Sequence, residues 1–475
     1  MPAIPAIPVR PVRPVGPSAA FTAALLGFFV VTLDASIVNV ALPAIGRDLG
    51  GGIAGLQWVV DGYVLVFAAL LLSAGSLSDR IGARRAFGTG LAVFVAASLA
   101  CGLAPDLPGL VAARLVQGTG AALMMPASLA LIREAYPDPV KRGRAIALWT
   151  IGGSVAAASG PVAGGALSLA SWRLIFFVNL PVGLLALAAL TGAARSPRRP
   201  VPFDAIGQAA AAAAMGGLTF AVIEAGADGF AAPRVLAAFA LAVGGAVAFC
   251  LSQRFGRHPM VPADLLRLPT VVIASGTGFA FIGGFSGTVF VYSLYLQEQR
   301  GLSPLATGLT FVPMTLLSGF AGLPAARLAE RFGPRVPIIG GLAFMGAGLV
   351  VLAALPATVP VWLAAVVMIP VGVCGPLAIA PTTALLLETV PADRSGVASG
   401  VFNTSRQIGG ALAVAVFGAL LAHRAQFERG LRESLLIAAA LALAAAAANL
   451  LTKPARRPAA APPADGRGTA LAECG

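Results

Sequence analysis

The chain has 475 residues, of which 58% are hydrophobic and 11% are charged. A soluble domain carries about 25% charged residues, so this composition excludes a water-exposed globule and favours a protein surrounded by lipid. The net charge of +13 does not indicate nucleic-acid binding, because the basic residues fall in short clusters between apolar runs and form no single basic face.

The apolar runs predict fourteen membrane-spanning helices, each about 20 residues long. Their expected centres lie near residues 32, 68, 94, 120, 156, 183, 215, 242, 283, 315, 345, 373, 410 and 443. Residues 1–19 and 453–475 lie outside these runs, and we expect both to be tails. The loops that hold most Lys and Arg alternate along the chain, so the positive-inside rule predicts that both tails are cytoplasmic.

One loop occurs twice in the sequence. Gly75–Arg84 follows the second predicted span, and Ala326–Arg335 follows the tenth. The two segments share Leu, Arg, Gly and Arg at equivalent positions, and Asp79 of the first is matched by Glu330 of the second. A repeat of this kind indicates two parallel halves in one membrane fold.

A shorter repeat supports the same division. Glu134 and Pro137 follow span four, and Glu388 and Pro391 follow span twelve. We therefore expect an all-α membrane protein with two six-helix bundles and two inserted helices. The expected divisions are a tail at 1–19, a bundle at 20–194, the insertion at 195–268, a second bundle at 269–452 and a tail at 453–475.

The repeated loop predicts a conformational role. Gly75 would allow two helices to approach closely, and Asp79 at a helix end can pair with Arg80 or with the basic residues of the next loop. Such pairs can hold the cytoplasmic side closed in one state; the alternative is a positive-inside loop with a helix cap. The candidate gating residues of the two loops are Gly75, Asp79, Arg80, Gly82, Arg84, Glu330 and Arg331.

Spans four and five carry further motifs. Arg114 and Gln117 lie on one face of span four, where a charge near the membrane centre costs at least about 2.5–3.5 kcal/mol and needs a partner or water. In span five, Gly160 and Gly164 lie on a face of small residues that allows a neighbouring helix to approach, and Pro161 predicts a kink. Generic small-residue packing is the alternative for span five.

These motifs together resemble the major facilitator superfamily, and specifically its fourteen-span drug:proton antiporters. Leu33–Pro43 in span one, Trp172–Pro181 before span six and Tyr295–Pro304 between spans nine and ten are also similar to that subgroup. The resemblance covers roughly residues 20–450 and implies the major facilitator fold. It also implies alternating access, in which the two halves rock about a site near the membrane midplane.

Asp34 is the expected proton-coupling carboxylate, with Asp61 and Arg114 beside it. Depth along the spans places the three residues where they can share one cavity. Desolvation favours a protonated carboxylate, whereas Arg114 favours the charged form, so the two effects oppose each other. The alternatives are a permanent ion pair between Asp34 and Arg114, and a solvated interfacial position for Asp61.

The expected substrate contacts are polar residues within the spans, namely Asn39, Gln117, Asn403, Arg406 and Gln407. Relatives that export dicationic antiseptics place acids in span ten or thirteen, and residues 305–325 and 398–421 contain none. We therefore expect amphipathic substrates that are neutral, zwitterionic, anionic or at most singly charged.

The function that the motifs predict is proton-coupled efflux of antibiotics, drugs or secondary metabolites across a bacterial cytoplasmic membrane. A proton-coupled nutrient importer and a non-transporting membrane sensor are the alternatives. The four Cys residues form no CxxC pair and there are only two His residues, so we expect neither a metal site nor an enzyme. We expect a monomer that needs the lipid bilayer, its substrate and protons, with the proton gradient in place of a cofactor.

Overall fold

The computed structural model describes residues 17–194, 196–198, 204–256, 259–356, 358–391, 394–422 and 426–451, and all secondary structure in these ranges is helical. Thirteen helices are long and apolar enough to cross a membrane, and a bent pair supplies a fourteenth span. Every predicted span centre falls inside one of these spans, which confirms the predicted fold class. Span one begins at Pro17, inside the predicted tail, while residues 1–16 and 453–475 lie outside the described residues.

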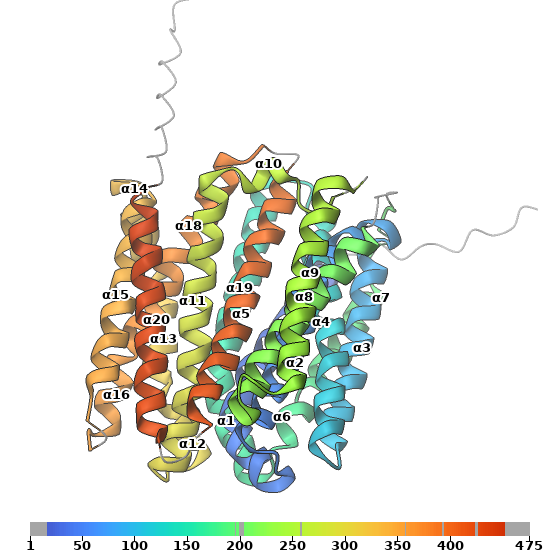
Figure 1. The fold of residues 1–475 in the computed structure, drawn as a ribbon. Coiled ribbons are helices and arrows are strands. Elements are labelled where there is room, and N and C mark those ends of the chain that lie inside the picture. The colour runs from blue at the N-terminus through green and yellow to red at the C-terminus, as the bar shows by residue number, and fades with distance from the viewer. Residues whose placement is uncertain are drawn as a thin grey trace, which may run out of the picture.

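The helices run side by side, with α15, α16 and α20 toward one side of the bundle and α3 and α7 toward the other (Figure 1). In chain order they are α1 (Pro17–Leu49), α2 (Gly52–Ile81), α3 (Ala83–Leu103), α4 (Leu107–Ala135), α5 (Pro139–Ala170), α6 (Leu174–Phe177), α7 (Asn179–Thr191), α8 (Ala205–Asp228), α9 (Pro233–Phe255), α10 (Ala263–Leu266), α11 (Pro269–Leu294), η1 (Tyr295–Gln299), α12 (Pro304–Thr310), α13 (Val312–Phe320), α14 (Gly322–Phe332), α15 (Arg335–Ala354), α16 (Val361–Val367), α17 (Ile369–Cys374), η2 (Gly375–Ile379), α18 (Ala380–Thr389), α19 (Ser395–Leu421) and α20 (Phe427–Asn449).

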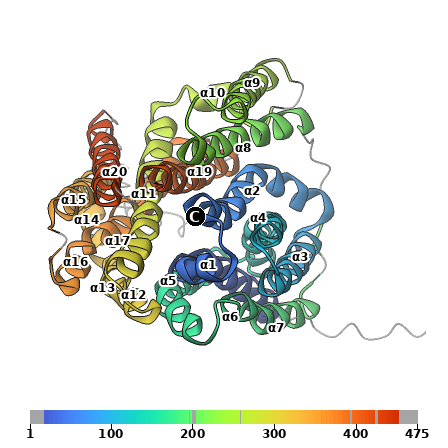
Figure 2. The same cartoon turned by 60° about the horizontal axis from the view of Figure 1, so that its bottom comes forward.

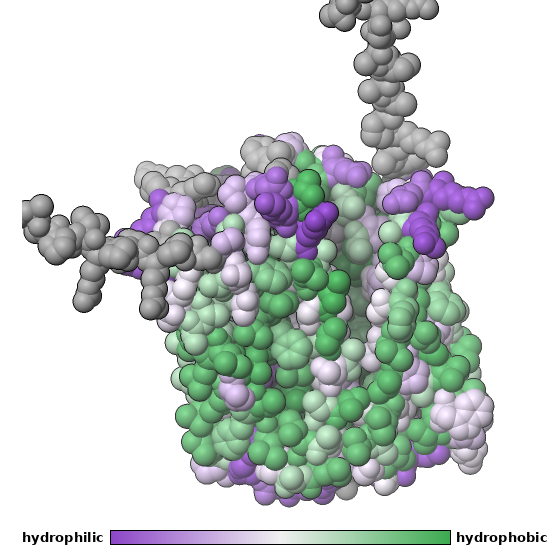
Figure 3. Space-filling model, turned by 180° about the vertical axis from the view of Figure 1, so that it is seen from behind, coloured by the Kyte–Doolittle hydropathy of each residue, from purple (hydrophilic) through white to green (hydrophobic). Residues whose placement is uncertain are grey.

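The outer surface fits a lipid environment. A broad band around the middle of the molecule is apolar, and hydrophilic side chains gather at its two ends (Figure 3). Large apolar side chains such as Leu184, Val243 and Leu251 are exposed on this surface. An exposed apolar band flanked by polar ends is what a multi-pass membrane protein presents to the bilayer.

Three spans are interrupted, and proline explains the interruptions. Because proline has no N–H and its ring clashes with the carbonyl four residues earlier, it breaks the regular helix just before it. The bend between Pro304–Phe320 and Gly322–Phe332 is 43°. The breaks at Val178, Phe311, Ala321 and Met368 lie two or three residues before Pro181, Pro313, Pro324 and Pro370.

The repeated loops adopt the same structure in both halves. Gly82 and Gly333 have φ angles of +92° and +84°, a left-handed conformation that glycine tolerates best. Arg84 donates to the carbonyls of Leu190 and Thr191 at the end of α7. Arg335 makes the equivalent bonds to the carbonyls at the end of α20. Each arginine thereby satisfies the last carbonyls of the sixth helix in its own half.

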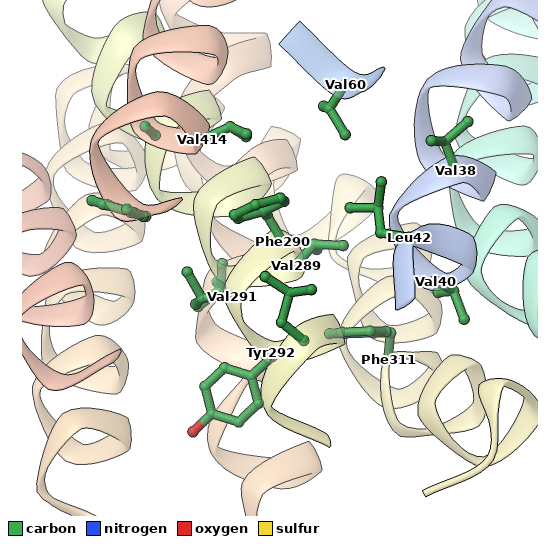
Figure 4. Close-up of a cluster of buried hydrophobic side chains, with 14 of the residues drawn as sticks. Val38, Val40, Leu42, Val60, Val289, Phe290, Val291, Tyr292, Phe311 and Val414 are labelled. Carbon is green, nitrogen blue, oxygen red and sulfur yellow. The ribbon is translucent and has the colours of Figure 1, made fainter. Parts of the chain in front are cut away.

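The two halves share a hydrophobic core toward only one end of the bundle. We call the end with Gly82 and Gly333 the motif end, and the other end the far end. Toward the far end, Val38 and Leu42 of α1 face Val289 and Phe290 of α11 within one buried cluster (Figure 4). The clusters toward the motif end each contain side chains of one half alone. The interface between the two halves, which we call the seam, is therefore closed at the far end.

The inserted helices pack beside this seam. α8 contacts both α2 of the first half and α19 of the second, and α9 packs on its outer side (Figure 2). Gln208 of α8 bonds the Ser73 hydroxyl and the Ala69 carbonyl of α2. Near the other end of α8, Glu224 accepts a hydrogen bond from the indole of Trp58, also on α2, at 3.2 Å. The polar contacts of α8 thus fasten it to the first half.

Candidate functional site

A buried ion pair lies at the centre of the first half. Arg114 Nη1 of α4 is 2.5 Å from Asp34 Oδ2 of α1, and the two side chains are 1% and 0% exposed. A charged carboxylate or guanidinium that is excluded from water in this way is stable only with an oppositely charged partner and further hydrogen bonds. The predicted approach of Asp34 and Arg114 is therefore present in the structure.

Three more elements complete the network around Asp34. Gln117 and Asn179 each donate an amide hydrogen to Asp34 Oδ1, at 2.9 Å and 2.7 Å. Ser98 of α3 accepts from Asn179 at 2.9 Å and donates to the carbonyl of Phe176. Asp34 thus accepts one bond from Arg114 and two from amides, which leaves its charge well compensated.

Arg114 also has acceptors other than Asp34. Its Nε donates to the carbonyl of Val59 on α2 at 3.0 Å, and its Nη1 donates to Gln117 Oε1 at 2.7 Å. Its guanidinium lies 4.3 Å from the centre of the Tyr63 ring. A guanidinium with these contacts stays positioned even if Asp34 becomes neutral.

Asn179 reaches Asp34 because of the break between α6 and α7. Pro181 prevents a regular helix through Val178, and Asn179 is the first residue of the new helix. Its side chain is fully buried, and its amide meets both Asp34 and Ser98. Sequence reasoning noted Asn179 as part of a motif but did not place it beside Asp34, because partners on another helix leave no periodic signal.

Asp61 does not join this network. It is fully buried in α2, yet neither carboxylate oxygen has a hydrogen-bond partner in the part of the chain that the structure describes. Gln57, one turn earlier, contacts α19, and Trp58 contacts α8. At about 100° per residue, Asp61 lies between these two directions. The structure thus brings Asp34 and Arg114 together and leaves Asp61 near the contacts with α8 and α19.

The glycines of span five meet α1, as expected for a close helix contact. A Cβ on Gly160 would lie 1.9 Å from Ser36 Oγ, and one on Gly164 would lie 2.5 Å from the carbonyl oxygen of Ile37. Pro161 lies in α5, which runs unbroken from Pro139 to Ala170, and its carbonyl contacts Gly308 of α12 in the other half. This segment of α5 therefore packs within its own half on one side and across the seam on the other.

The expectation for Gly75 is wrong in this structure. A Cβ added there would meet nothing within 4 Å, because the motif end of α2 is not packed against a neighbour at this point. Asp79 and Arg80 are exposed, and Asp79 forms no ion pair within the described part of the chain. Glu330 and Arg331 are exposed likewise. The predicted latch is thus not formed here and stays a prediction for another state.

The remaining predicted contacts lie on two helices. Asn39 donates to the carbonyl of Ala35 in its own helix and is separate from the Asp34 network. On α19, Arg406 Nη1 donates to Asn403 Oδ1 at 3.1 Å, and Gln407 is half-buried on the adjoining position. The structure therefore groups Asn403 and Arg406 and leaves Asn39 apart.

Two glutamines that join the halves were not assigned a role from the sequence. Gln57 of α2 donates to the carbonyls of Val414 and Ala415 on α19, at 2.9 Å and 2.6 Å. Gln297 of η1 donates to the carbonyl of Val40 on α1 at 2.8 Å. All three bonds cross the seam toward the far end, and both glutamines are buried.

The comparisons with known proteins agree with this architecture. The sequence profile of the Major Facilitator Superfamily matches residues 24–414 and again 274–473. The chain belongs to the major facilitator superfamily. Among superfamily members, the methylenomycin A resistance protein of Streptomyces coelicolor is 36% identical over 447 residues, which cover 92% of this chain and 93% of that protein.

Other superfamily relatives have similar names. The multidrug resistance protein Stp of Mycobacterium tuberculosis is 36% identical over 84% of this chain and 74% of its own length. The tetracenomycin C resistance and export protein of Streptomyces glaucescens is 34% identical over 85% of this chain and 75% of its own length.

A solved superfamily structure shares the fold. The bacterial homologue of the human lysosomal transporter Spinster, in an inward-facing and unoccupied conformation, aligns with 93% of this chain and 97% of its own at a TM-score of 0.65. Its sequence is 19% identical, so the likeness concerns the fold alone.

Proposed function

We propose that this protein exports amphipathic small molecules from the bacterial cytoplasm in exchange for protons. It is a multi-pass transport protein and not an enzyme. The relatives at 34–36% identity are named for resistance to, or export of, antibiotics and drugs, which supports efflux over import. The Lys and Arg residues of the loops support a cytoplasmic motif end and cytoplasmic termini. We expect the monomer to be the working unit.

The observation that carries the proposal is the environment of Asp34. When Asp34 is charged, Arg114, Gln117 and Asn179 all donate to it. When it takes up a proton, the ion pair is lost, but Arg114 keeps the Val59 carbonyl as an acceptor. The same set of side chains can therefore hold both protonation states, as a proton-carrying site must.

A change in the protonation of Asp34 can be transmitted to the seam through α1. Asp34 and Val40 lie on this one helix, about 9 Å apart along its axis. The Val40 carbonyl accepts the bond from Gln297 of the other half. A shift of α1 on loss of the ion pair would therefore act on a contact that closes the far end.

The arrangement supports alternating access. With the motif end in the cytoplasm, the closed far end corresponds to an inward-facing state. In the opposite state the far end opens, Asp34 becomes accessible from outside, and the exposed motif-end residues can meet. At ~150 mV one proton provides about 3.5 kcal/mol, which supports roughly a 300-fold gradient of a neutral substrate.

Inside-out membrane vesicles that contain the full chain provide the test. An imposed pH gradient, acidic inside, should drive uptake of an amphipathic antibiotic into these vesicles. Asp34→Asn should abolish gradient-driven uptake, because an amide cannot bind and release the proton. Asp228→Asn is a matched control, since Asp228 lies at the end of α8 and pairs with Arg234. Normal uptake by Asp34→Asn would contradict the proposed proton site, and gradient-driven movement in the opposite direction would favour an importer.

A further inference from the structure

Arg406 carries a charge that no acidic side chain of the described residues compensates. It lies in the middle of α19, and its one hydrogen bond in the described residues goes to Asn403 Oδ1, at 3.1 Å. Its Nε is buried without a hydrogen-bond partner. None of the ion pairs formed in the described ranges includes Arg406. Arg114, by contrast, has Asp34 and further acceptors.

The direction of Arg406 follows from the contacts of its helix. On α19, the segment at Val414 and Ala415 meets α2, and Ala419 meets Gly226 of α8. Arg406 packs its Cγ over Gly278 of α11. At about 100° per residue, Arg406 and Asn403 lie on the side of α19 opposite the contact with α8.

This side of α19 faces the interior between the halves. α8 lies on the outer side of α2 and α19 (Figure 2). The opposite side therefore lies between α11 and α2: Arg406 is at its α11 edge, where its Cγ meets Gly278, and Asn403 is nearer α2. The bond from Arg406 to Asn403 turns the guanidinium away from α11 and toward this region.

Asp61 is a second buried ionisable side chain that has no hydrogen-bond partner among the described residues, and its direction differs. It follows Gln57 by one turn and is rotated toward Trp58, whose indole meets Glu224 of α8. Asp61 thus lies on the α8 side of the contact between α2 and α19, whereas Arg406 lies on the opposite side. Asp61 is consequently not placed to neutralise Arg406 in this arrangement.

The N–H groups of Arg406 that Asn403 does not engage lie along one edge of the guanidinium. Asn403 accepts from Nη1, Nε is buried without a partner, and no hydrogen bond formed within the described residues involves Nη2, so Nε and Nη2 form the unengaged edge. This pair of N–H groups matches the two oxygens of a carboxylate or sulfonate in a bidentate contact. The Phe402 ring, centred 5.8 Å from the guanidinium carbon, adds an apolar surface beside it.

We propose that Arg406, held by Asn403, recognises an acidic group on the exported molecule, so that the preferred substrates are amphipathic anions. The inference rests on the proposed function, because it assigns a substrate class to that same transport pathway. An acidic group supplies the acceptor that Nε lacks and neutralises a charge that is costly at membrane depth. Arg406 is then a specificity-determining residue.

A matched pair of fluorescent probes tests the proposal. 8-Anilinonaphthalene-1-sulfonate and N-phenyl-1-naphthylamine share one aromatic body and differ in the sulfonate. Gradient-driven uptake of each is measured in inside-out vesicles with the full chain. Uptake of the sulfonate should fall about tenfold or more in Arg406→Gln, whereas uptake of the neutral probe stays within about twofold. Arg406→Lys, which keeps the charge but loses the planar edge, should lie between wild type and Arg406→Gln.

The controls separate recognition from folding. Asn403→Ala should weaken sulfonate uptake selectively, because it removes the group that positions Arg406. Arg335→Gln changes an arginine that binds main-chain carbonyls at the motif end, and it should not discriminate between the probes. An equal loss of both probes in Arg406→Gln would assign Arg406 a structural role and overturn the proposal. Uptake of only the neutral probe by wild type would overturn it and leave export intact, whereas uptake of neither would count against export itself.

Discussion

The amide of Asn179 donates to Asp34 across 2.7 Å, and the same amide donates to Ser98 at 2.9 Å. The bond joins the first residue of α7 to the middle of α1. Asn179 thereby fixes the position of a carboxylate that also pairs with Arg114.

Asn179→Ala should reduce gradient-driven efflux by about tenfold or more, because one hydrogen bond to a charged group contributes about 1.5–3 kcal/mol. The measurement is the initial rate of uptake into inside-out vesicles. Asn449→Ala is the matched control: Asn449 is also buried and donates to Thr277 at 2.7 Å, but it lies in the other half. Equal rates for the two variants would remove Asn179 from the coupling site.

Arg114→Gln should lower the apparent Tm of the purified protein more than the double variant Asp34→Asn with Arg114→Gln does. The single change leaves a buried carboxylate without its cation, which costs about 3–5 kcal/mol, whereas the double change removes both charges. Thermal unfolding in one detergent compares the variants. A double variant that is less stable than Arg114→Gln would show that the pair is not coupled as described.

Two glycines of α5 should respond differently to the same substitution. Gly160→Leu should reduce the amount of folded protein, because its Cβ would meet α1 of the same half. Gly165→Leu should preserve folding and impair transport, because its Cβ would lie 2.5 Å from the Pro304 carbonyl oxygen across the seam. Size-exclusion recovery and uptake rates distinguish the effects. A variant Gly165→Leu with normal transport would show that this contact does not limit the cycle.

Gln57→Leu should open the far end. It removes two buried bonds across the seam, which together contribute about 2 kcal/mol, roughly a thirtyfold change in the equilibrium between two states. Labelling of Val60→Cys by a membrane-impermeant maleimide, in a cysteine-free background, reports this opening. Gln208→Leu is the control, since Gln208 is buried but joins α8 to α2 of the same half. Faster labelling in both variants would point to general loosening instead.

Exposed positions at the two ends provide a test of orientation. Pro105 lies at the far end and Arg267 at the motif end, and both are exposed. In intact cells, Pro105→Cys should react with an impermeant maleimide and Arg267→Cys should not, because the basic loops predict a cytoplasmic motif end. Asp106 is left unchanged in this test because it caps α4 by accepting from the amide of Gly109. The reverse labelling pattern would invert the topology.

Periodicity and charge predicted much of the fold. The fourteen spans follow from apolar length, and the pairing of Asp34 with Arg114 follows from depth along two spans. Asn179, Ser98 and Gln57 could not be placed in this way, because their partners lie on helices whose packing is set by tertiary contacts. The expectation for Gly75 failed for a related reason: a small residue permits close packing but does not supply a neighbour.

The breaks in the helices were predictable from the sequence only in part. Pro181 and Pro324 favour a helix break at these positions, whereas Pro161 lies within the unbroken α5, and the direction of the segment after a break depends on what packs against it. Thus the position of the break before Asn179 is readable in the sequence, whereas its consequence for Asp34 is not.

The seam bonds of Gln57 and Gln297 end on main-chain carbonyls, which every amino acid provides. A substitution at Val40, Val414 or Ala415 therefore keeps the acceptor, although each of these side chains is itself buried. Variation at these three positions is thus limited by side-chain packing within the bundle and not by the bonds that hold its halves together.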